Sequence, residues 1–304
     1  MPSFECPNCA ANSDAEYCDC YPIFTGKPQF KNGTTFNKNK SKRYISCELE
    51  YSNIFGFQNV AEHCYKSKHN IVSDGSIEGS FPFEICTCPT SGDEFLQEIQ
   101  DLTKVLGENK VAVNKSCGFH VHIDSRDMNF YDLRKFAMIY CKIEDYIFEC
   151  LPLSRRNSEF CNKCASKLED LFLGRIRQKP KGRFVREFYG LSGWVLTDNR
   201  IKEHLNCCKN DKYYYKRYWA LNIHSWMMRG TLENRCAAGT YDYEKIVNWA
   251  LLWAYIIDYA VENTEKNIKE LINNCVSHED LLKIILEKDT KVYDWLCCRY
   301  TIIN

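Results

Sequence analysis

The segment Cys117–Asp124 reads Cys-Gly-Phe-His-Val-His-Ile-Asp, and from Phe119 on it alternates strictly between apolar and polar residues. Successive side chains on a β-strand point to opposite faces, so this pattern predicts a strand with one apolar and one polar face. The polar face carries His120, His122 and Asp124. Burial of the apolar face would fix the register, because a slip of one residue would bury both histidines. An ordinary half-exposed strand has the same pattern, so a function depends on what neighbouring strands present.

Two earlier segments are predicted as strands with acidic residues on one face. Tyr44–Tyr51 would place Glu48 and Glu50 on the same side, and two such glutamates repel each other unless a cation or a base lies between them. Phe81–Cys88 would turn Glu84 away from the core, and the proline that follows ends the strand. Solvated strand faces are common, but carboxylates in this arrangement are also typical ligands of a divalent metal.

A later pair of segments is predicted to extend the sheet. Tyr218–His224 is expected to be a strand, and Arg229–Arg235 its partner. One face of the second strand would carry Arg229, Thr231, Glu233 and Arg235. Arginine beside glutamate on a surface is an ion pair of little energetic value. In a cleft, Glu233 would instead hold a metal while the arginines bind phosphate.

Apolar residues at helical spacing predict helices between and after these strands. The predicted helices are a segment beginning at Ser91 and reaching Leu106, then Asn129–Cys150, Asp242–Asn263, Glu265–Cys275 and His278–Lys288, with the last two finishing the chain. Together the elements predict an α+β fold: a mainly antiparallel, curved sheet with one polar face, and helices packed on the other face.

The N-terminus carries a separate cysteine cluster. Cys6 and Cys9 form a Cys-x-x-Cys pair, and Cys18 and Cys20 follow closely, which is the composition of a tetrahedral structural zinc site. The alternative is a loose tail with incidental thiols. We therefore predict a zinc segment at residues 1–24, a linker rich in Lys, Asn and Gly at 25–42, and a catalytic domain at 43–304.

A second cysteine group lies within the domain. Cys161 and Cys164 form another Cys-x-x-Cys pair, and Cys207 with Cys208 would complete a metal site if the fold brought them together. The surrounding segment, Leu151–Arg186, is irregular and rich in Lys and Arg, and it is a candidate for a loop that covers the site.

Composition excludes some classes of protein. Lys plus Arg and Asp plus Glu both number 40, which argues against a general nucleic-acid binder. No apolar run is long enough for a membrane span, and no apolar segment follows the first residue as a signal peptide would require. The 19 cysteines are not spaced like a secreted disulfide scaffold, so we expect reduced thiols and a cytoplasmic protein.

The charged faces indicate a type of chemistry. Several carboxylates with an imidazole suit hard cations such as Mg²⁺ or Mn²⁺, and nearby arginines suit the phosphates that those cations would bridge. The sequence contains neither a P-loop nor a Rossmann glycine pattern. These features favour nucleotide-dependent chemistry on an unrelated scaffold.

The ordered motifs resemble those of the amidoligase family, which comprises carboxylate–amine ligases with the glutamine synthetase fold. The motifs that carry the resemblance span roughly Arg43 to Ala260, and they are the Glu-x-Glu strand, an Asp-Gly-Ser turn, Phe-Glu-Ile, Cys-Gly-Phe-His-Val-His and Gly-Thr-Leu-Glu-Asn-Arg. The resemblance implies that ATP phosphorylates a substrate carboxylate and that an amine then attacks the acyl phosphate to give an amide. It also implies a small-molecule or peptide substrate, an amine acceptor and, in some relatives, a homo-oligomer.

The resemblance also implies a role for each motif residue. The ligands of two Mg²⁺ (or Mn²⁺) ions would be Glu48, Glu50, Glu84, His120 and Glu233. The ATP phosphates would be contacted by His122, Arg229 and Arg235, with Arg235 stabilising the transferring phosphoryl group. Arg217 is a further candidate for the nucleotide or the substrate, and Glu84 would act at the reaction centre. Asn234 and the cysteine-rich segments depart from the family pattern, which leaves the substrate open.

Two other classes remain alternatives. A metal-dependent hydrolase would use a zinc-bound water at His120 and His122, with His224 available as a further ligand. In that case the glutamates would have no task. A non-catalytic binding module would leave the carboxylates solvated and use the zinc segment to dock a partner.

Overall fold

The computed structural model describes residues 41–173, 188–190, 207–208, 211 and 214–303. The predicted zinc segment with Cys6, Cys9, Cys18 and Cys20 lies outside the described residues, as does most of the predicted linker. The last part of the predicted covering loop, from residue 174 to residue 186, lies outside them as well.

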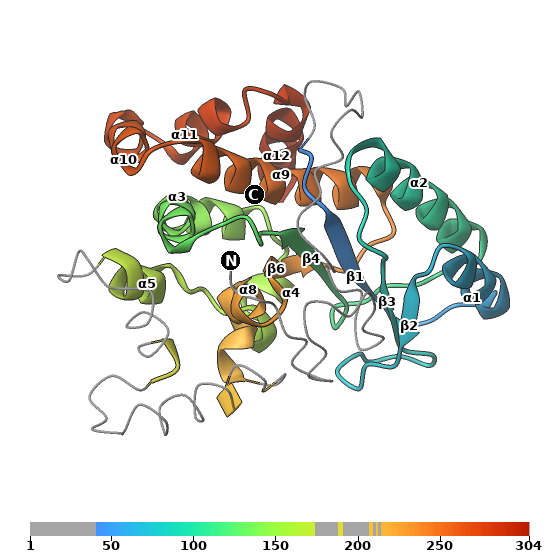
Figure 1. Ribbon diagram of the computed structural model, residues 1–304. Coiled ribbons are helices and arrows are strands. Elements are labelled where there is room, and N and C mark those ends of the chain that lie inside the picture. Colours follow the sequence, from blue (N-terminus) through green and yellow to red (C-terminus); the bar gives the residue numbers. More distant parts are fainter. Residues whose placement is uncertain (1–40, 174–187, 191–206, 209–210, 212–213, 304) are drawn as a thin grey trace.

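The described residues form a six-stranded sheet in the order β2-β3-β1-β4-β6-β5, and every neighbouring pair of strands is antiparallel. The strands are β1 (Ile45–Tyr51), β2 (Asn70–Val72), β3 (Phe83–Cys86), β4 (Gly118–Asp124), β5 (Leu221–Asn222) and β6 (Thr231–Ala238). Figure 1 shows β1 and β4 side by side in the middle of the molecule. The predicted antiparallel sheet is therefore confirmed.

One predicted strand is mostly wrong. Of Tyr218–His224, only Leu221 and Asn222 belong to a strand, and helix α8 (Ile223–Arg229) follows at once. The Asn222 side chain caps this helix by accepting a hydrogen bond from the amide of Ser225. Gly230 then ends it in the left-handed conformation, with φ at 77°. Arg229 is therefore the last residue of a helix and not a strand residue beside Glu233.

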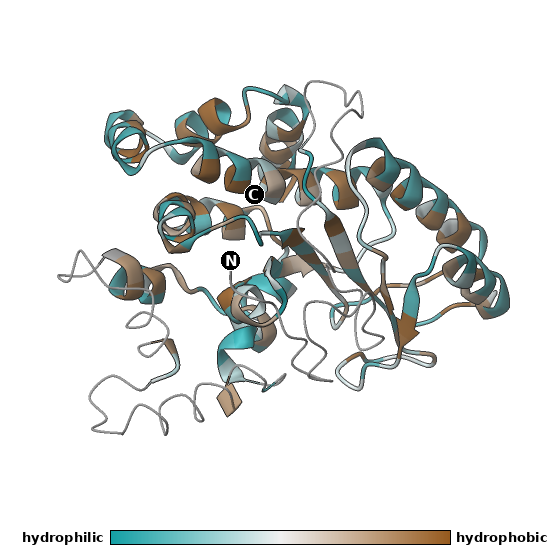
Figure 2. Cartoon of the chain, viewed as in Figure 1, coloured by the Kyte–Doolittle hydropathy of each residue, from teal (hydrophilic) through white to brown (hydrophobic). Residues whose placement is uncertain are grey.

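Helices cover the apolar face of the sheet (Figure 1). The layer consists of α2 (Gly92–Glu108), α3 (Phe130–Glu149) and α9 (Tyr243–Glu262). The strand residues Leu49 and Val121 share one buried core with Ile99 of α2, Phe136 of α3 and Trp253 of α9. Figure 2 shows hydrophobic residues concentrated on α9 and alternating with hydrophilic ones along α2. Burial of these apolar side chains is the main force that holds the sheet to its helices.

The remaining helices differ from the prediction at both ends of the chain. Helix α1 (Phe57–Lys66) and helix α12 (Thr290–Ile303) had not been predicted. The predicted C-terminal pair is present as α10 (Glu265–Asn274) and α11 (His278–Ile285), but α12 follows it. The segment after α3 contains α4 (Leu153–Arg156), η1 (Glu159–Cys161), α5 (Ala165–Leu168) and η2 (Glu169–Leu173), and η3 (Tyr215–Tyr218) precedes β5. Within the described residues, no helix is both long and apolar enough to cross a membrane.

A buried arginine anchors the first strand of the sheet. The Arg43 side chain is 2% exposed and lies two residues before β1. It donates two hydrogen bonds to the Asp127 carboxylate, at 2.7 and 2.9 Å, and one to Asp258 of α9 at 2.6 Å. It also donates to the carbonyl of Asp124 at the end of β4. This network joins β1, β4 and α9, and it fixes the strand that carries Glu48 and Glu50.

Candidate active site

Strand register gathers the polar residues of four strands on one face. Glu48 of β1 lies opposite Cys86 of β3 on one side and His120 of β4 on the other. Further along the same face, Glu50 lies opposite Glu84, and His122 lies opposite Glu233. Directly opposed side chains in an antiparallel sheet lie close enough to interact. The glutamates and histidines that the sequence singled out therefore converge on one site.

Glu48 lies at the centre of this arrangement. Its carboxylate oxygens contact Nδ1 of His120 at 3.0 Å and Nε2 of His122 at 3.1 Å. Although burial raises the pKa of Glu48, the two neighbouring imidazoles outweigh it and hold that pKa well below the usual range. Arg229 reaches the same carboxylate from the end of α8, with 3.9 Å between Nη1 and Oε1. Arg229 thus belongs to the site even though it is not on the predicted strand.

The opposite end of the site is purely acidic. Burial, and then the charges of Glu48 and Glu50, raise the pKa of Glu84 to about 8. Asp74, from the loop after β2, is the third acidic neighbour. The Glu50 carboxylate accepts a hydrogen bond from the amide of Gly118 and lies 3.5 Å from Nε2 of His120. Acidic side chains packed in this way repel one another, and a cation between them would remove the penalty.

On the β6 side of the site, Glu233 is almost fully buried beside Arg235. Burial alone would raise the pKa of Glu233, but the charge of Arg235 and then that of His122 lower it to about 2. The amide of Asn222 donates a further hydrogen bond to the same carboxylate, at 2.7 Å. The Nε atom of Arg235 is buried and has no hydrogen-bond partner in the described part of the chain. This arginine thus retains a donor for a bound anion.

Beside Glu233 and Arg235 lies a small cleft with a mixed polar and apolar lining. Three arginines line it from different elements: Arg217 from η3, Arg229 from α8 and Arg235 from β6. Glu48 and Glu233 line the same cleft. Guanidinium groups are well suited to bind phosphate, and carboxylates to bind the cation that accompanies it. The cleft therefore has the composition of a site for a metal-bound polyphosphate.

The donor atoms fit divalent cations. Three groups of possible ligand atoms each lie within 4.8 Å of one another, and they are Glu50–Asp74–Glu84, Glu48–Glu84–Cys86 and Glu48–His122–Glu233. Adjacent groups share Glu84 or Glu48, so the three form one continuous row. Oxygen-rich donors suit Mg²⁺ or Mn²⁺, and the repulsion that raises the pKa of Glu84 is relieved when a cation binds. His120 lies within 3.5 Å of both glutamates of β1.

Three features of the site were not predicted. Thr231 holds Nδ1 of His122 at 3.0 Å and so orients the imidazole toward Glu48. Gly118 leaves the site open, since a Cβ there would lie 3.1 Å from Nε2 of His120 and 3.2 Å from Oε2 of Glu50. Thr231 was placed on the right face by strand alternation, but no partner could be assigned to it. Gly118 is the first residue of the histidine strand, and a glycine in a strand suggests close approach of another group.

The third feature is Arg155, which supports a β-bulge. Between Phe119 and Val121 the register of β4 with β6 shifts, so that Arg235 and Cys236 together oppose His120. Arg155 of α4 is 3% exposed, and it donates hydrogen bonds to the carbonyls of Arg235 at 2.6 Å and Cys236 at 3.3 Å. It thus satisfies carbonyls at the bulge. The sequence offers no local signal for this contact, because 80 residues separate the partners.

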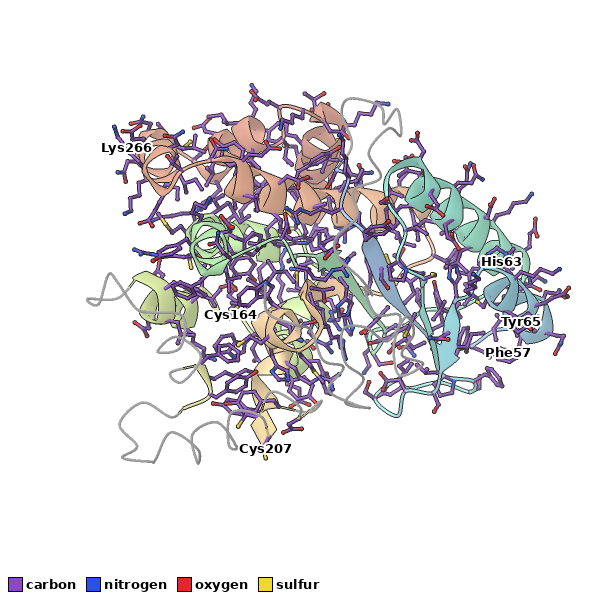
Figure 3. All side chains as sticks on the ribbon, in the orientation of Figure 1. Phe57, His63, Tyr65, Cys164, Cys207 and Lys266 are labelled. Carbon is purple, nitrogen blue, oxygen red and sulfur yellow. The ribbon has the colours of Figure 1, made fainter. Side chains whose placement is uncertain are left out.

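The second cysteine site does not form among the described residues. Cys161 and Cys164 are buried in the apolar core, whereas Cys207 is exposed. Figure 3 shows Cys164 and Cys207 well apart. None of these cysteines, nor Cys208, belongs to a group of possible metal ligands in the described part of the chain. The Cys161–Cys164 pair therefore serves packing, with the Cys161 thiol donating to the carbonyl of Arg155 at 3.3 Å.

His224 does not join the other histidines as a ligand. Its Nδ1 atom contacts the Tyr189 hydroxyl at 2.8 Å, and its Nε2 atom contacts the carbonyl of Asp211 at 3.0 Å. Burial lowers its pKa to about 4. His224 lines the cleft but belongs to none of the three ligand groups. His224 is therefore not positioned as the further ligand that was available to the hydrolase alternative beside His120 and His122.

The sequence is similar to a known protein family. The sequence model of the family described as "Putative amidoligase enzyme" matches residues 37–257. This range contains every strand of the sheet and all of the site residues described above. No curated protein is significantly similar to the chain.

Proposed function

The chain belongs to the amidoligase family, and from that premise we propose that it is an ATP-dependent carboxylate–amine ligase. It would form an amide through an acyl-phosphate intermediate, using two divalent cations. The sheet would then have the glutamine synthetase type of architecture. The substrates would be a small molecule or peptide with a carboxylate, and an amine acceptor. The family match supports a ligase, and the site supports the finer statements.

The observation that supports the proposal most directly is the row of ligand groups beside the arginine cleft. The row draws on β1, β3, β4 and β6, whose residues lie far apart in the sequence. A solvated polar face would not bury Glu84 to 8% exposure beside Glu48 and Glu50, since burial of a charged group is costly without a partner of opposite charge. The cost is understandable if the face holds cations.

The residues divide into cation ligands and phosphate-binding groups. The cations would be held by Glu48, Glu50, Glu84, His120 and Glu233. When bound, they would neutralise phosphate charge and align the γ-phosphate with the attacking oxygen. Arg217, Arg229 and Arg235 line the cleft next to these ligands and would bind the phosphate oxygens. His122 lies between Glu48 and Glu233 and would contact the same phosphates.

Two successive substitutions would then complete the reaction, the first at the γ-phosphorus and the second at the acyl carbon. A carboxylate oxygen of the substrate attacks the γ-phosphorus, and the bond to ADP breaks. The amine nitrogen attacks the acyl carbon, inorganic phosphate leaves, and the amine loses a proton to give the amide. Arg235, with its buried donor, would stabilise charge on the transferring phosphoryl group. The chain needs no nucleophile of its own, which agrees with a site built from acids, imidazoles and guanidinium groups.

The proposal is tested by ADP release from the full chain with Mg²⁺ and ATP, measured across a panel of carboxylates and amines. We expect ADP release that depends on both Mg²⁺ and an acceptor, and its loss in Glu48→Gln and His120→Ala. Matched controls are Glu78→Gln and His278→Ala, which change exposed side chains of the same types. Wild-type rates in the two site variants would refute the assignment. Hydrolysis without ATP would favour the hydrolase, and Mg²⁺-independent binding alone would favour the binding module.

A further inference from the structure

Cys86 is a buried thiol on the polar side of the sheet. It is 3% exposed and lies directly opposite Glu48 in the pairing of β3 with β1. Its Sγ donates a hydrogen bond to Oε1 of Glu84 at 2.9 Å. Other buried cysteines, such as Cys47 and Cys236, belong to the apolar core, but Cys86 does not. Its place among carboxylates therefore needs a reason other than hydrophobic packing.

The row of ligand groups is chemically uneven because of this thiol. The outer group Glu50–Asp74–Glu84 offers only carboxylate oxygens, which suit Mg²⁺. The middle group Glu48–Glu84–Cys86 offers two carboxylates and one sulfur, with all three ligand atoms within 4.8 Å of one another. Thiolate sulfur selects softer cations, while Mg²⁺ gains little from it. Two neighbouring positions in one site thus have different metal preferences.

We propose that the Glu48–Glu84–Cys86 group binds a thiophilic divalent cation of the zinc type through the Cys86 sulfur. This inference rests on the proposed function, because it uses the same cation site and assigns a metal class to one position of it. On binding, a metal–sulfur bond forms and the thiol proton, which is donated to Glu84 in the free protein, is released to solvent. The two carboxylates and the thiolate then offset the charge of the ion.

Two properties of the location support this assignment. Cys86 is the last residue of β3 but is paired on both sides, so its Cα position is fixed by the ladder with β1 and β2. Glu48, its cross-strand partner, is held in turn by His120 and His122. Ligands that are fixed by backbone pairing and by neighbouring side chains need little reorganisation to hold an ion.

The test is a Co²⁺ titration of the full chain, because a Co²⁺–thiolate bond has a near-ultraviolet charge-transfer band that carboxylates do not give. The titration uses a background with Cys6→Ser, Cys9→Ser, Cys18→Ser and Cys20→Ser, so that the N-terminal thiols give no signal. We expect a band that saturates with one ion and is lost in Cys86→Ser, together with a roughly 10- to 100-fold weaker Co²⁺ affinity. The matched control is Cys88→Ser, which removes a thiol two residues along and should keep the band.

The circular dichroism of the Cys86→Ser and Cys86→Val variants shows whether they fold. Persistence of the band in folded Cys86→Ser, or Co²⁺ binding without any band, would overturn the inference. Mg²⁺-dependent ADP release is measured separately on the unsubstituted chain. ADP release without the band leaves the ligase proposal standing and removes the thiophilic site. The band without ADP release supports the thiophilic site and contradicts the ligase proposal.

Discussion

Replacement of Glu84 by glutamine should stabilise the metal-free protein. Glu84 is 8% exposed, and burial together with the charges of Glu48 and Glu50 raises its pKa to about 8. A carboxyl group whose pKa is raised on folding binds more protons in the folded state than in the unfolded state. Its contribution to the free energy of unfolding is therefore fully present below the unfolded pKa near 4.5. This contribution is lost as the pH rises to about 8.

The magnitude follows from the size of this pKa change. At about 1.4 kcal/mol per pH unit, the rise from 4.5 to about 8 corresponds to a loss of roughly 3 to 5 kcal/mol of unfolding free energy. Glutamine is nearly isosteric with the protonated acid and carries no charge, so the variant avoids this loss. With EDTA at pH 9, Glu84→Gln should melt on the order of 10 °C above wild type. At pH 4.5 the two proteins should melt together.

Divalent cations should reverse the order of the two melting temperatures. Saturating Mg²⁺ at pH 9 should raise the melting temperature of wild type, because the ion binds the folded state and relieves the repulsion between Glu84 and Glu48. The Glu84→Gln variant should gain little. The assay is differential scanning fluorimetry of both proteins and of the exposed control Glu78→Gln, from pH 4.5 to 9, with EDTA or Mg²⁺. A variant less stable than wild type at pH 9 in EDTA would contradict the reasoning.

Two further substitutions test the support of the site. Arg43→Met removes a buried guanidinium that donates to Asp127, to Asp258 and to the carbonyl of Asp124, and it should lower the unfolding free energy by about 3 kcal/mol, since these charge-assisted hydrogen bonds are lost. Urea unfolding measures the change, and the exposed-pair control Lys66→Met should shift the midpoint little. Gly118→Ala places a methyl group 3.1 Å from an imidazole nitrogen and 3.2 Å from a carboxylate oxygen. It should weaken Mg²⁺ binding in calorimetry by about tenfold, equivalent to ~1.4 kcal/mol, and unchanged affinity would show that the neighbours move aside freely.

The sequence was most informative where alternation was strict. In β1 and β4 the apolar residues leave only one register that buries them, so the faces of Glu48, Glu50, His120 and His122 could be assigned directly. The strand around Glu84 was predictable for the same reason. Pairing of β1 with both β3 and β4 could not be predicted from any single segment. It depends on long-range contacts, such as the Arg43 network with Asp258.

Prediction failed where capping residues outweigh alternation. Tyr218–His224 was predicted to be a strand. Instead, Asn222 is the N-cap residue of a short helix, and Gly230 supplies its left-handed end. Helix α1 was missed because it buries only Val60 and Cys64, a single pair at helical spacing. Helix α12 likewise has just two buried residues, and its Trp295 packs against Trp249 of α9. Weak amphipathic patterns of this kind need their tertiary partners to be recognised.

The bulge in β6 explains how one strand serves two tasks. An uninterrupted strand would alternate strictly from Glu233 onward, so Arg235 and Ala237 would lie on the same polar face. The extra residue opposite His120 resets the alternation, and Ala237 instead pairs with Phe119 on the apolar face. Arg235 can therefore face the cleft while the end of the strand packs in the core. Arg155 satisfies the bulge carbonyls, so a residue outside the sheet helps to set the position of the arginine that would meet the phosphoryl group.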